Sequence, residues 1–220
     1  MSDILSQIQE IGIVPVVKLN NVEKAIPLCK ALMSGGINVA EITFRTECAG
    51  EIIKKITIDC SEMIVGAGTI INVEQAKLAI ECGAKFIVSP GFSRDIVKYC
   101  QSQNIPVIPG CITPSEIMQA IDCGLNVVKF FPAKEFGGLS TMKSLSAPFG
   151  QIKFMPTGGI SLDNLKEFIS AKFIVACGGT YMVKDDLINN DKFEEITNLS
   201  KQSINIIKEA RKWKSFVLEK

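Results

Sequence analysis

The sequence of 220 residues contains no histidine. Its absence removes the commonest metal ligand in proteins and the usual general base near neutral pH. Cysteine occurs eight times, but the cysteines are dispersed through apolar segments and form no Cys-x-x-Cys pair that would hold zinc or carry out redox chemistry. We therefore expect reduced, mostly buried cysteines, no metal and no cofactor, which leaves any chemistry to lysine, carboxylates and hydroxyl groups.

Long apolar runs and an excess of one charge are also missing. No apolar stretch is long enough to span a bilayer, and the segment Met1–Gln7 has neither the basic start nor the apolar run of a secretion signal. The 24 basic and 23 acidic side chains leave a net charge of +1, which provides no overall field to attract nucleic acid or a membrane surface. We expect a soluble, cytoplasmic protein that binds small molecules, with no nucleic-acid or membrane partner.

The chain does contain a regular series of short apolar runs. Hydrophobic residues make up 47% of the sequence, which is typical of parallel strands that are buried on both faces. The starts of the runs fall about 20 to 26 residues apart, the period of repeated β-loop-α units. The predicted strands are Ile13–Val17, Val39–Thr43, Ile64–Gly68, Phe86–Ser89, Pro106–Pro109, Val127–Phe131, Lys153–Thr157 and Ile174–Gly178.

Helical patterns separate these strands. They lie at Val22–Ser34, Glu47–Ile58, Val73–Cys82, Arg94–Gln103, Ser115–Cys123, Leu139–Ala147, Leu162–Ser170 and Lys192–Ala210. Such a chain can close into a barrel or remain a doubly wound sheet, and the even repeat favours a TIM (β/α)8 barrel. We predict one α/β domain over residues 1–220, a short capping helix at Asp3–Ile11, and a basic tail at Arg211–Lys214 that is solvated or part of an interface.

Lys129 is a charged residue inside the apolar run Val127–Phe131. In a barrel strand alternate side chains point inward, and those near the carboxyl end face the site that such enzymes build there. An ammonium group in this position is partly desolvated, which favours the neutral amine that attacks a carbonyl and forms an imine. The alternative is a lysine in a buried ion pair, or one that reaches solvent from the strand end.

Glu41 and Arg45 lie in and just after the strand predicted at Val39–Thr43. Glu41 is expected to point into the barrel, where its carboxylate could move protons beside a Schiff base. Arg45 has the planar fork that grips a carboxylate, and a 2-keto acid carries a carboxylate beside its carbonyl. The alternatives are an ion pair of Glu41 with Lys129 or Arg45, and an ordinary surface arginine.

Thr69 and Lys18 follow two further predicted strands. Gly66 and Gly68 let a ligand approach the backbone before Thr69, whose hydroxyl can bond to a carboxylate or carbonyl oxygen. Helix capping is the alternative role for Thr69. Lys18 adds positive charge at the barrel mouth, or is simply an exposed lysine.

The last two predicted strands end in glycine pairs, in Thr157-Gly158-Gly159 and Gly178-Gly179-Thr180. Many barrels bind phosphate after strands seven and eight, where backbone N–H groups and a helix N-terminus converge on the anion. Thr180 could add a hydroxyl donor to such a site. The alternative is that both turns need glycine for their backbone conformation alone.

Taken together, these residues resemble those of the KDPG/KHG aldolases, class I lyases that act on 2-keto-3-deoxy-6-phosphogluconate or 2-keto-4-hydroxyglutarate. The resemblance covers nearly the whole chain. Its strongest matches, in the family's order, are Glu41–Thr46, Val65–Thr69, Ser89–Gly91, Pro109–Gly110, Val128–Ala133 and Pro156–Ile160.

The resemblance implies a Schiff-base lysine at Lys129 and a general acid/base at Glu41. It further implies carboxylate binding by Arg45 and Thr69, a homotrimer, and no metal. The remaining implied positions are two that line the pocket, Pro90 and Thr157, and four that receive the phosphate, Gly158, Gly159, Gly179 and Thr180. The family often has serine where this chain has Thr180, so the hydroxyl is retained with an added methyl group.

The expected reaction is cleavage of phosphorylated 2-keto-3-deoxygluconate into pyruvate and glyceraldehyde 3-phosphate, and of hydroxyglutarate into pyruvate and glyoxylate. One rival is the same chemistry on the galactonate epimer. A rival from another class is a phosphate-binding barrel, an isomerase or a binding protein, in which Lys129 only pairs with Glu41.

Overall fold

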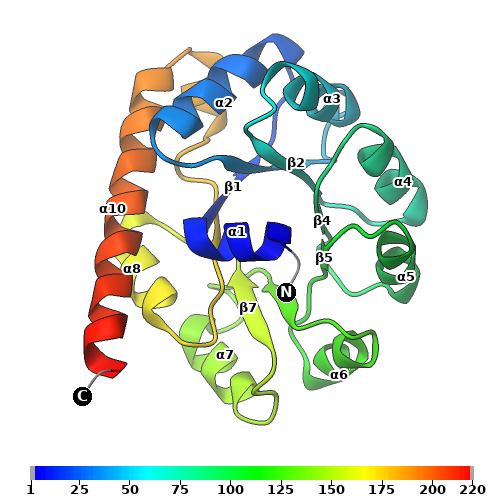
Figure 1. Cartoon of the computed structure of the whole chain (residues 1–220), viewed down its shortest axis with the longest axis vertical. Coiled ribbons are helices and arrows are strands. Elements are labelled where there is room, and N and C mark those ends of the chain that lie inside the picture. The colour runs from blue at the N-terminus through cyan, green and yellow to red at the C-terminus, as the bar shows by residue number, and fades with distance from the viewer. Residues whose placement is uncertain (1–2, 219–220) are drawn as a thin grey trace.

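The computed structural model describes residues 3–218, with side chains described for residues 3–211. Strands alternate with helices along the chain, and every strand pair is parallel. Figure 1 shows the helices arranged around the strands. Within residues 3–218, no helix is both long and apolar enough to cross a membrane.

The strands form two sheets. They are β1 (Ile13–Val17), β2 (Val39–Thr43), β3 (Ile64–Gly68), β4 (Ile87–Val88), β5 (Val107–Ile108), β6 (Val127–Phe130), β7 (Lys153–Pro156) and β8 (Cys177–Gly179). Six pair in the order β5-β4-β3-β2-β1-β8, and β6 pairs with β7. Three isolated parallel bridges lie outside these pairings, Gly110 to Lys129, Phe154 to Ile174 and Thr157 to Gly178. The fold therefore belongs to the predicted α/β class and has a curled parallel sheet. Regular strand pairing, however, joins six strands into one sheet rather than all eight.

The predicted bounds of β1, β2 and β3 are confirmed residue for residue. The last strand begins later than predicted, at Cys177 rather than Ile174. The Ile174 N–H donates to the Ala171 carbonyl 3.2 Å away in a turn, and only an isolated bridge joins Ile174 to Phe154 of β7. A strand residue would instead direct its N–H to a neighbouring strand.

The helices follow the predicted pattern with three differences, the first of which is that the last helix runs beyond the predicted end at Ala210 to Leu218. The helices are α1 (Asp3–Ile11), η1 (Val22–Lys24), α2 (Ala25–Ser34), α3 (Ala49–Asp59), α4 (Val73–Glu81), α5 (Arg94–Ser102), α6 (Pro114–Asp122), α7 (Gly138–Ser146), α8 (Leu162–Ser170), α9 (Asp185–Asn189) and α10 (Phe193–Leu218). The helix expected at Val22–Ser34 is split, and Pro27 falls in the first turn of α2, where a missing N–H is tolerated. The short helix α9 was not predicted.

Side-chain caps mark the starts of three of the helices that follow strands. Asn72, Ser93 and Thr113 each accept a hydrogen bond from a backbone N–H in the first turn of α4, α5 and α6. A cap of this kind stabilises a helix by about 1 kcal/mol. These caps therefore help to fix the lengths of the loops that lead from β3, β4 and β5 into their helices.

The helix α1 covers the end of the sheet at which the strands begin. Leu5 and Ile8 are buried, and Leu5 lies beside Val107 and Val127 at the starts of β5 and β6. The capping helix is thus confirmed. The Arg211 guanidinium donates to the carbonyls of Gln9 and Glu10, so this residue of the basic tail is bound rather than solvated. The side chains of Lys212, Trp213 and Lys214 lie outside the described residues.

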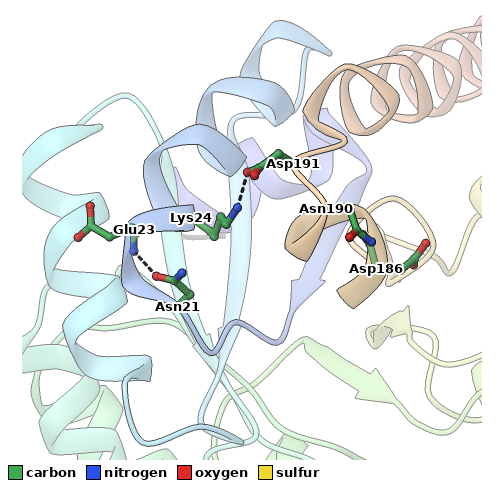
Figure 2. Close-up of polar contacts among 6 residues, drawn as sticks. All are labelled: Asn21, Glu23, Lys24, Asp186, Asn190 and Asp191. Atoms are coloured by element: carbon green, nitrogen blue, oxygen red, sulfur yellow. Dashed lines mark hydrogen bonds and ion pairs between the residues drawn. The ribbon is translucent and has the colours of Figure 1, made fainter.

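Ionic contacts tie the last part of the chain to the first. Lys24, at the end of η1, forms an ion pair with Asp191 in the turn between α9 and α10, as Figure 2 shows. Lys18, after β1, lies 3.6 Å from Asp185 at the start of α9. The helix α10 packs against α2 and α8 (Figure 1). These contacts hold α9 close to the carboxyl end of β1.

Candidate active site

The predicted site residues lie in or just after the strands, toward their carboxyl ends. Because the strands are parallel, these ends meet at one side of the sheet. The helix α1 covers the opposite side, so the carboxyl ends are the side on which the loops can form a site. The residues differ in burial, and only some of them are brought into contact.

Lys129 and Glu41 meet in the interior. The Lys129 Nζ lies 3.6 Å from Glu41 Oε1, and the two residues are 5% and 0% exposed. They belong to β6 and β2, which are not neighbours in either sheet, so the two side chains reach each other across the interior. The distance allows strong attraction but exceeds that of a hydrogen bond.

Three buried polar atoms in this region have no hydrogen-bond partner among the described residues. They are both carboxylate oxygens of Glu41 and the hydroxyl oxygen of Thr157, which follows β7. Buried polar groups in folded proteins are almost always bonded, and a purely structural ion pair needs saturated hydrogen bonds to offset its desolvation. This arrangement fits groups that bond to a polar ligand better than it fits a structural ion pair.

Two glycines make room for these groups. A Cβ added at Gly68 would lie 1.9 Å from Glu41 Oε1, and one added at Gly178 would lie 2.3 Å from the Thr157 hydroxyl oxygen. Any side chain at Gly68 would therefore displace the carboxylate. Gly68 is thus required by the packing of Glu41.

Thr69 has a strained backbone. Its φ of 58° lies in the left-handed region, which a β-branched residue rarely adopts. Strain of this kind costs on the order of 1–3 kcal/mol and is concentrated at functional sites. Thr69 is partly buried at the end of β3, as expected for a side chain that faces a ligand.

Arg45, Pro90 and Lys18 are not brought into contact with Lys129. Arg45 is exposed, and no described residue forms an ion pair with it, so the alternative Glu41–Arg45 pair is absent from residues 3–211. Pro90 is exposed, and its carbonyl packs against Gly110. Lys18 pairs with Asp185 instead.

Only the first of the two glycine turns has a backbone conformation that favours glycine. Gly158 and Gly159 have φ of 95° and 76°, which favours glycine. Gly179 ends β8 and Thr180 is exposed directly after it. Thr157 pairs with Gly178 in a parallel bridge, so the two turns start side by side.

The sequence analysis missed three residues that lie beside the predicted site residues. The Phe131 ring lies 5.1 Å from the Lys129 Nζ, a cation–π contact. Lys134 packs its side chain against Gly159 and donates its N–H to the Gly158 carbonyl at 3.2 Å. The Tyr181 hydroxyl lies 2.6 Å from that of Ser203. Only Phe131, in the same run as Lys129, left a signal in the sequence.

Cys111, whose backbone bonds to that of Lys129, has an unreactive thiol. The Cys111 N–H donates to the Lys129 carbonyl at 2.9 Å, and burial raises the pKa of the Cys111 thiol to about 12. A protonated thiol is a poor nucleophile. All eight cysteines are free and five are buried, which agrees with the expected packing role. Lysine is thus the stronger nucleophile candidate.

Comparisons with known proteins point to one family. The family model described as KDPG and KHG aldolase matches residues 4–199. The chain is 42% identical over 207 residues to the 2-dehydro-3-deoxy-phosphogluconate aldolase of Treponema pallidum, spanning 94% of this chain and 99% of that protein. It is 40% identical over 192 residues to the KHG/KDPG aldolase of Escherichia coli K12, spanning 87% and 90%.

A solved structure shares the fold. The KDPG aldolase from Legionella pneumophila, with pyruvate captured at low pH as a covalent carbinolamine intermediate, superposes with a TM-score of 0.87 at 35% identity. The match covers 90% of this chain and 96% of that chain.

The contact between Gly68 and Glu41 predicts the effect of one methyl group. Gly68→Ala should lower the free energy of unfolding by about 1–3 kcal/mol, the usual cost of overpacking. Gly150→Ala is the matched control, because nothing lies within 4 Å of a Cβ there, and it should leave stability unchanged or raise it by up to ~1 kcal/mol. Urea denaturation measures both. Equal stability of the two variants would show that the carboxylate does not occupy this space.

Proposed function

The chain belongs to the KDPG and KHG aldolase family, and from this we propose that it cleaves 2-keto-3-deoxy-6-phosphogluconate into pyruvate and glyceraldehyde 3-phosphate through a Schiff base on Lys129. We propose the same chemistry on 4-hydroxy-2-oxoglutarate, which gives pyruvate and glyoxylate. As a member of this family the chain is an aldolase, a carbon–carbon lyase. Its substrates and the roles of its residues are our proposals.

The observation that carries the proposal is the enclosed pair of Lys129 and Glu41. An amine lies 3.6 Å from a carboxylate that has no hydrogen-bond partner in the described part of the chain. Imine formation needs a nucleophilic amine and a nearby group that moves protons, and the two side chains supply both. The carbinolamine captured in the Legionella relative is an intermediate of this same chemistry.

The reaction begins when the neutral amine of Lys129 attacks the C2 carbonyl of the keto acid. Glu41 transfers protons as the carbinolamine forms and loses water to give the protonated imine. Loss of the C4 hydroxyl proton then breaks the C3–C4 bond, and its electrons pass into the iminium to form an enamine. The aldehyde leaves, C3 takes up a proton, and hydrolysis releases pyruvate and the free lysine.

The remaining residues are proposed to hold the substrate. Arg45 and Thr69 bind the carboxylate, a role supported by the free guanidinium of Arg45 and the strained backbone of Thr69. Pro90 and Thr157 line the pocket, and the unpaired hydroxyl of Thr157 supports this assignment. Lys18 forms an ion pair with Asp185, which reduces the positive charge that Lys18 adds at the carboxyl ends of the strands.

We propose that the phosphate binds between the two glycine turns, at Gly158, Gly159, Gly179 and Thr180. The parallel bridge from Thr157 to Gly178 starts the turns side by side, so that backbone N–H groups of both can face one anion. Lys134, packed on Gly159, adds a nearby positive charge.

We further propose that the eight strands close into a full (β/α)8 barrel as one domain. The bridges from Gly110 to Lys129 and from Thr157 to Gly178 support closure, because they join β6 and β7 to the two edge strands of the six-stranded sheet. A cytoplasmic location is supported by eight free thiols. The homotrimer stays a prediction drawn from the family resemblance.

The rival phosphate-binding barrel without Schiff-base chemistry is not favoured. The family match and the two curated relatives are aldolases. A structural Lys129–Glu41 pair would also leave both carboxylate oxygens buried without a hydrogen bond, at a cost of about 1–3 kcal/mol or more.

Replacing Lys129 should abolish cleavage. Lys129→Ala removes the nucleophile, and Lys129→Arg keeps a cation beside Glu41 but cannot form the imine. Glu41→Gln should slow turnover by about 10²–10⁴-fold while substrate still binds. A coupled assay of pyruvate release measures these rates, and circular dichroism checks the fold. Lys153→Ala, at the start of β7, is the lysine control and should keep full activity. Normal turnover by folded Lys129→Arg would disprove the mechanism.

Removing the Thr180 hydroxyl should affect only the phosphorylated substrate. Thr180→Val keeps the shape and removes one charge-assisted hydrogen bond, so kcat/KM for that substrate should fall by roughly 10- to 100-fold. The value for 4-hydroxy-2-oxoglutarate, which has no phosphate, should not change. Equal losses on both substrates would place the effect elsewhere in the site.

A further inference from the structure

One loop residue beside the proposed phosphate site is anchored to the last helix. The Tyr181 hydroxyl, just after β8, lies 2.6 Å from the Ser203 hydroxyl of α10. Ser203 is fully buried and donates its own proton to the Leu199 carbonyl at 2.7 Å. A hydroxyl has a single proton to donate, so Tyr181 is the donor in its contact with Ser203. Two hydrogen bonds in series thus join the end of β8 to α10.

This anchor holds the backbone of Thr180, which directly precedes Tyr181. On the other side of Thr180, Gly179 is paired with Pro15 of β1. The Thr180 carbonyl itself accepts a hydrogen bond from the Val183 N–H at 3.1 Å. The backbone of Thr180 is therefore held before, at and after the residue, while its side chain is exposed.

The ring of Tyr181 accounts for the glycine that ends β8. Gly179 does not have the left-handed backbone that favours glycine in the other turn. A Cβ added at Gly179 would lie 3.1 Å from the Tyr181 Cε1 and 3.3 Å from the Ile13 Cδ1. Both distances are shorter than ordinary van der Waals contact, so a side chain there would displace the ring or the isoleucine. The lack of a side chain at Gly179 therefore lets the ring pack against the end of β8.

The Tyr181 hydroxyl is a permanent hydrogen-bond donor. Burial raises the pKa of this hydroxyl to about 12, so it stays protonated at any physiological pH. A tyrosine hydroxyl that leaves solvent needs a partner, and Ser203 supplies an oxygen whose own proton is already used. Phenylalanine would fill the same space but would leave this oxygen without its donor.

We propose that Tyr181, through its hydrogen bond to Ser203, is a positioning residue that holds Thr180 in the orientation that binds the substrate phosphate. An anion is bound by several donors in a fixed arrangement, and a small displacement of one donor weakens the binding. Tyr181 therefore acts on the affinity for phosphorylated substrates and not on the bond that is cleaved. The inference rests on the proposed function, in which Thr180 receives the phosphate.

The test variant is Tyr181→Phe, which keeps the ring and removes the hydroxyl. It should raise KM for 2-keto-3-deoxy-6-phosphogluconate by about 3- to 10-fold, the equivalent of one hydrogen bond, and leave kcat unchanged. Both constants for 4-hydroxy-2-oxoglutarate should stay at their wild-type values. Tyr99→Phe, at the other tyrosine of the sequence, is the matched control and should behave as the wild type, because partly buried Tyr99 lies in α5.

A second variant tests the partner of the bond. Ser203→Ala removes the acceptor and should raise KM for the phosphorylated substrate by the same factor. Because both substitutions break one hydrogen bond, the double variant should be no weaker than either single variant. Additive losses would show that the two hydroxyls act separately and would contradict the inference.

Calorimetric binding of glycerol 3-phosphate, an unreactive probe, makes the same comparison without turnover. Tyr181→Phe should raise the Kd of this probe about 3- to 10-fold, and Tyr99→Phe should not change it. A wild-type protein that binds the probe but cleaves neither keto acid would refute the proposed function, while the comparison of Kd values would still test the role of Tyr181.

Three results would overturn the inference. They are a wild-type protein that does not bind the probe, a folded Tyr181→Phe variant with unchanged Kd, and an equal loss on 4-hydroxy-2-oxoglutarate, which would indicate a general effect on the fold. Circular dichroism establishes that each variant is folded.

Discussion

The attraction between Lys129 and Glu41 across the interior of the sheet is the interaction on which the site depends. The two groups come from strands that are not neighbours, and both are almost fully enclosed. Such a pair persists only if the surrounding chain supports it, because desolvation of two charges costs several kcal/mol per ion. The curled sheet brings the strands together, and Gly68 leaves the space that the carboxylate occupies. Fold and proposed chemistry therefore rest on the same contact.

Glycine has a second role at the carboxyl ends of the strands. Gly178 leaves room for the hydroxyl of Thr157, and Gly158 and Gly159 allow a left-handed backbone after β7. Thr69 takes up a left-handed conformation without being glycine, a strain of the kind that is concentrated at functional sites. The interior thus combines a few polar groups with backbone that approaches them closely. This combination is what a small keto acid with a carboxylate and a phosphate would need.

Much of this arrangement could be predicted from the sequence. The bounds of β1, β2 and β3 followed from apolar composition, and the alternation of side chains along a strand directed Glu41 and Lys129 inward. The helix α9 could not be predicted, because five residues are too few to show a helical period. Its absence from the prediction also hid the Lys18–Asp185 pair. The contact of Lys134 with Gly159, and the lack of hydrogen bonds to the carboxylate oxygens of Glu41, depend on tertiary packing, which no local pattern encodes.

Reduction with borohydride in the presence of pyruvate is the most direct test of the claim that Lys129 forms a Schiff base. Borohydride converts an imine into a stable secondary amine, which peptide mapping by mass spectrometry assigns to one residue. We expect a single pyruvate-derived adduct, on Lys129, that is formed only when both reagents are present. An unmodified Lys129, or an adduct confined to other lysines, would contradict the claim.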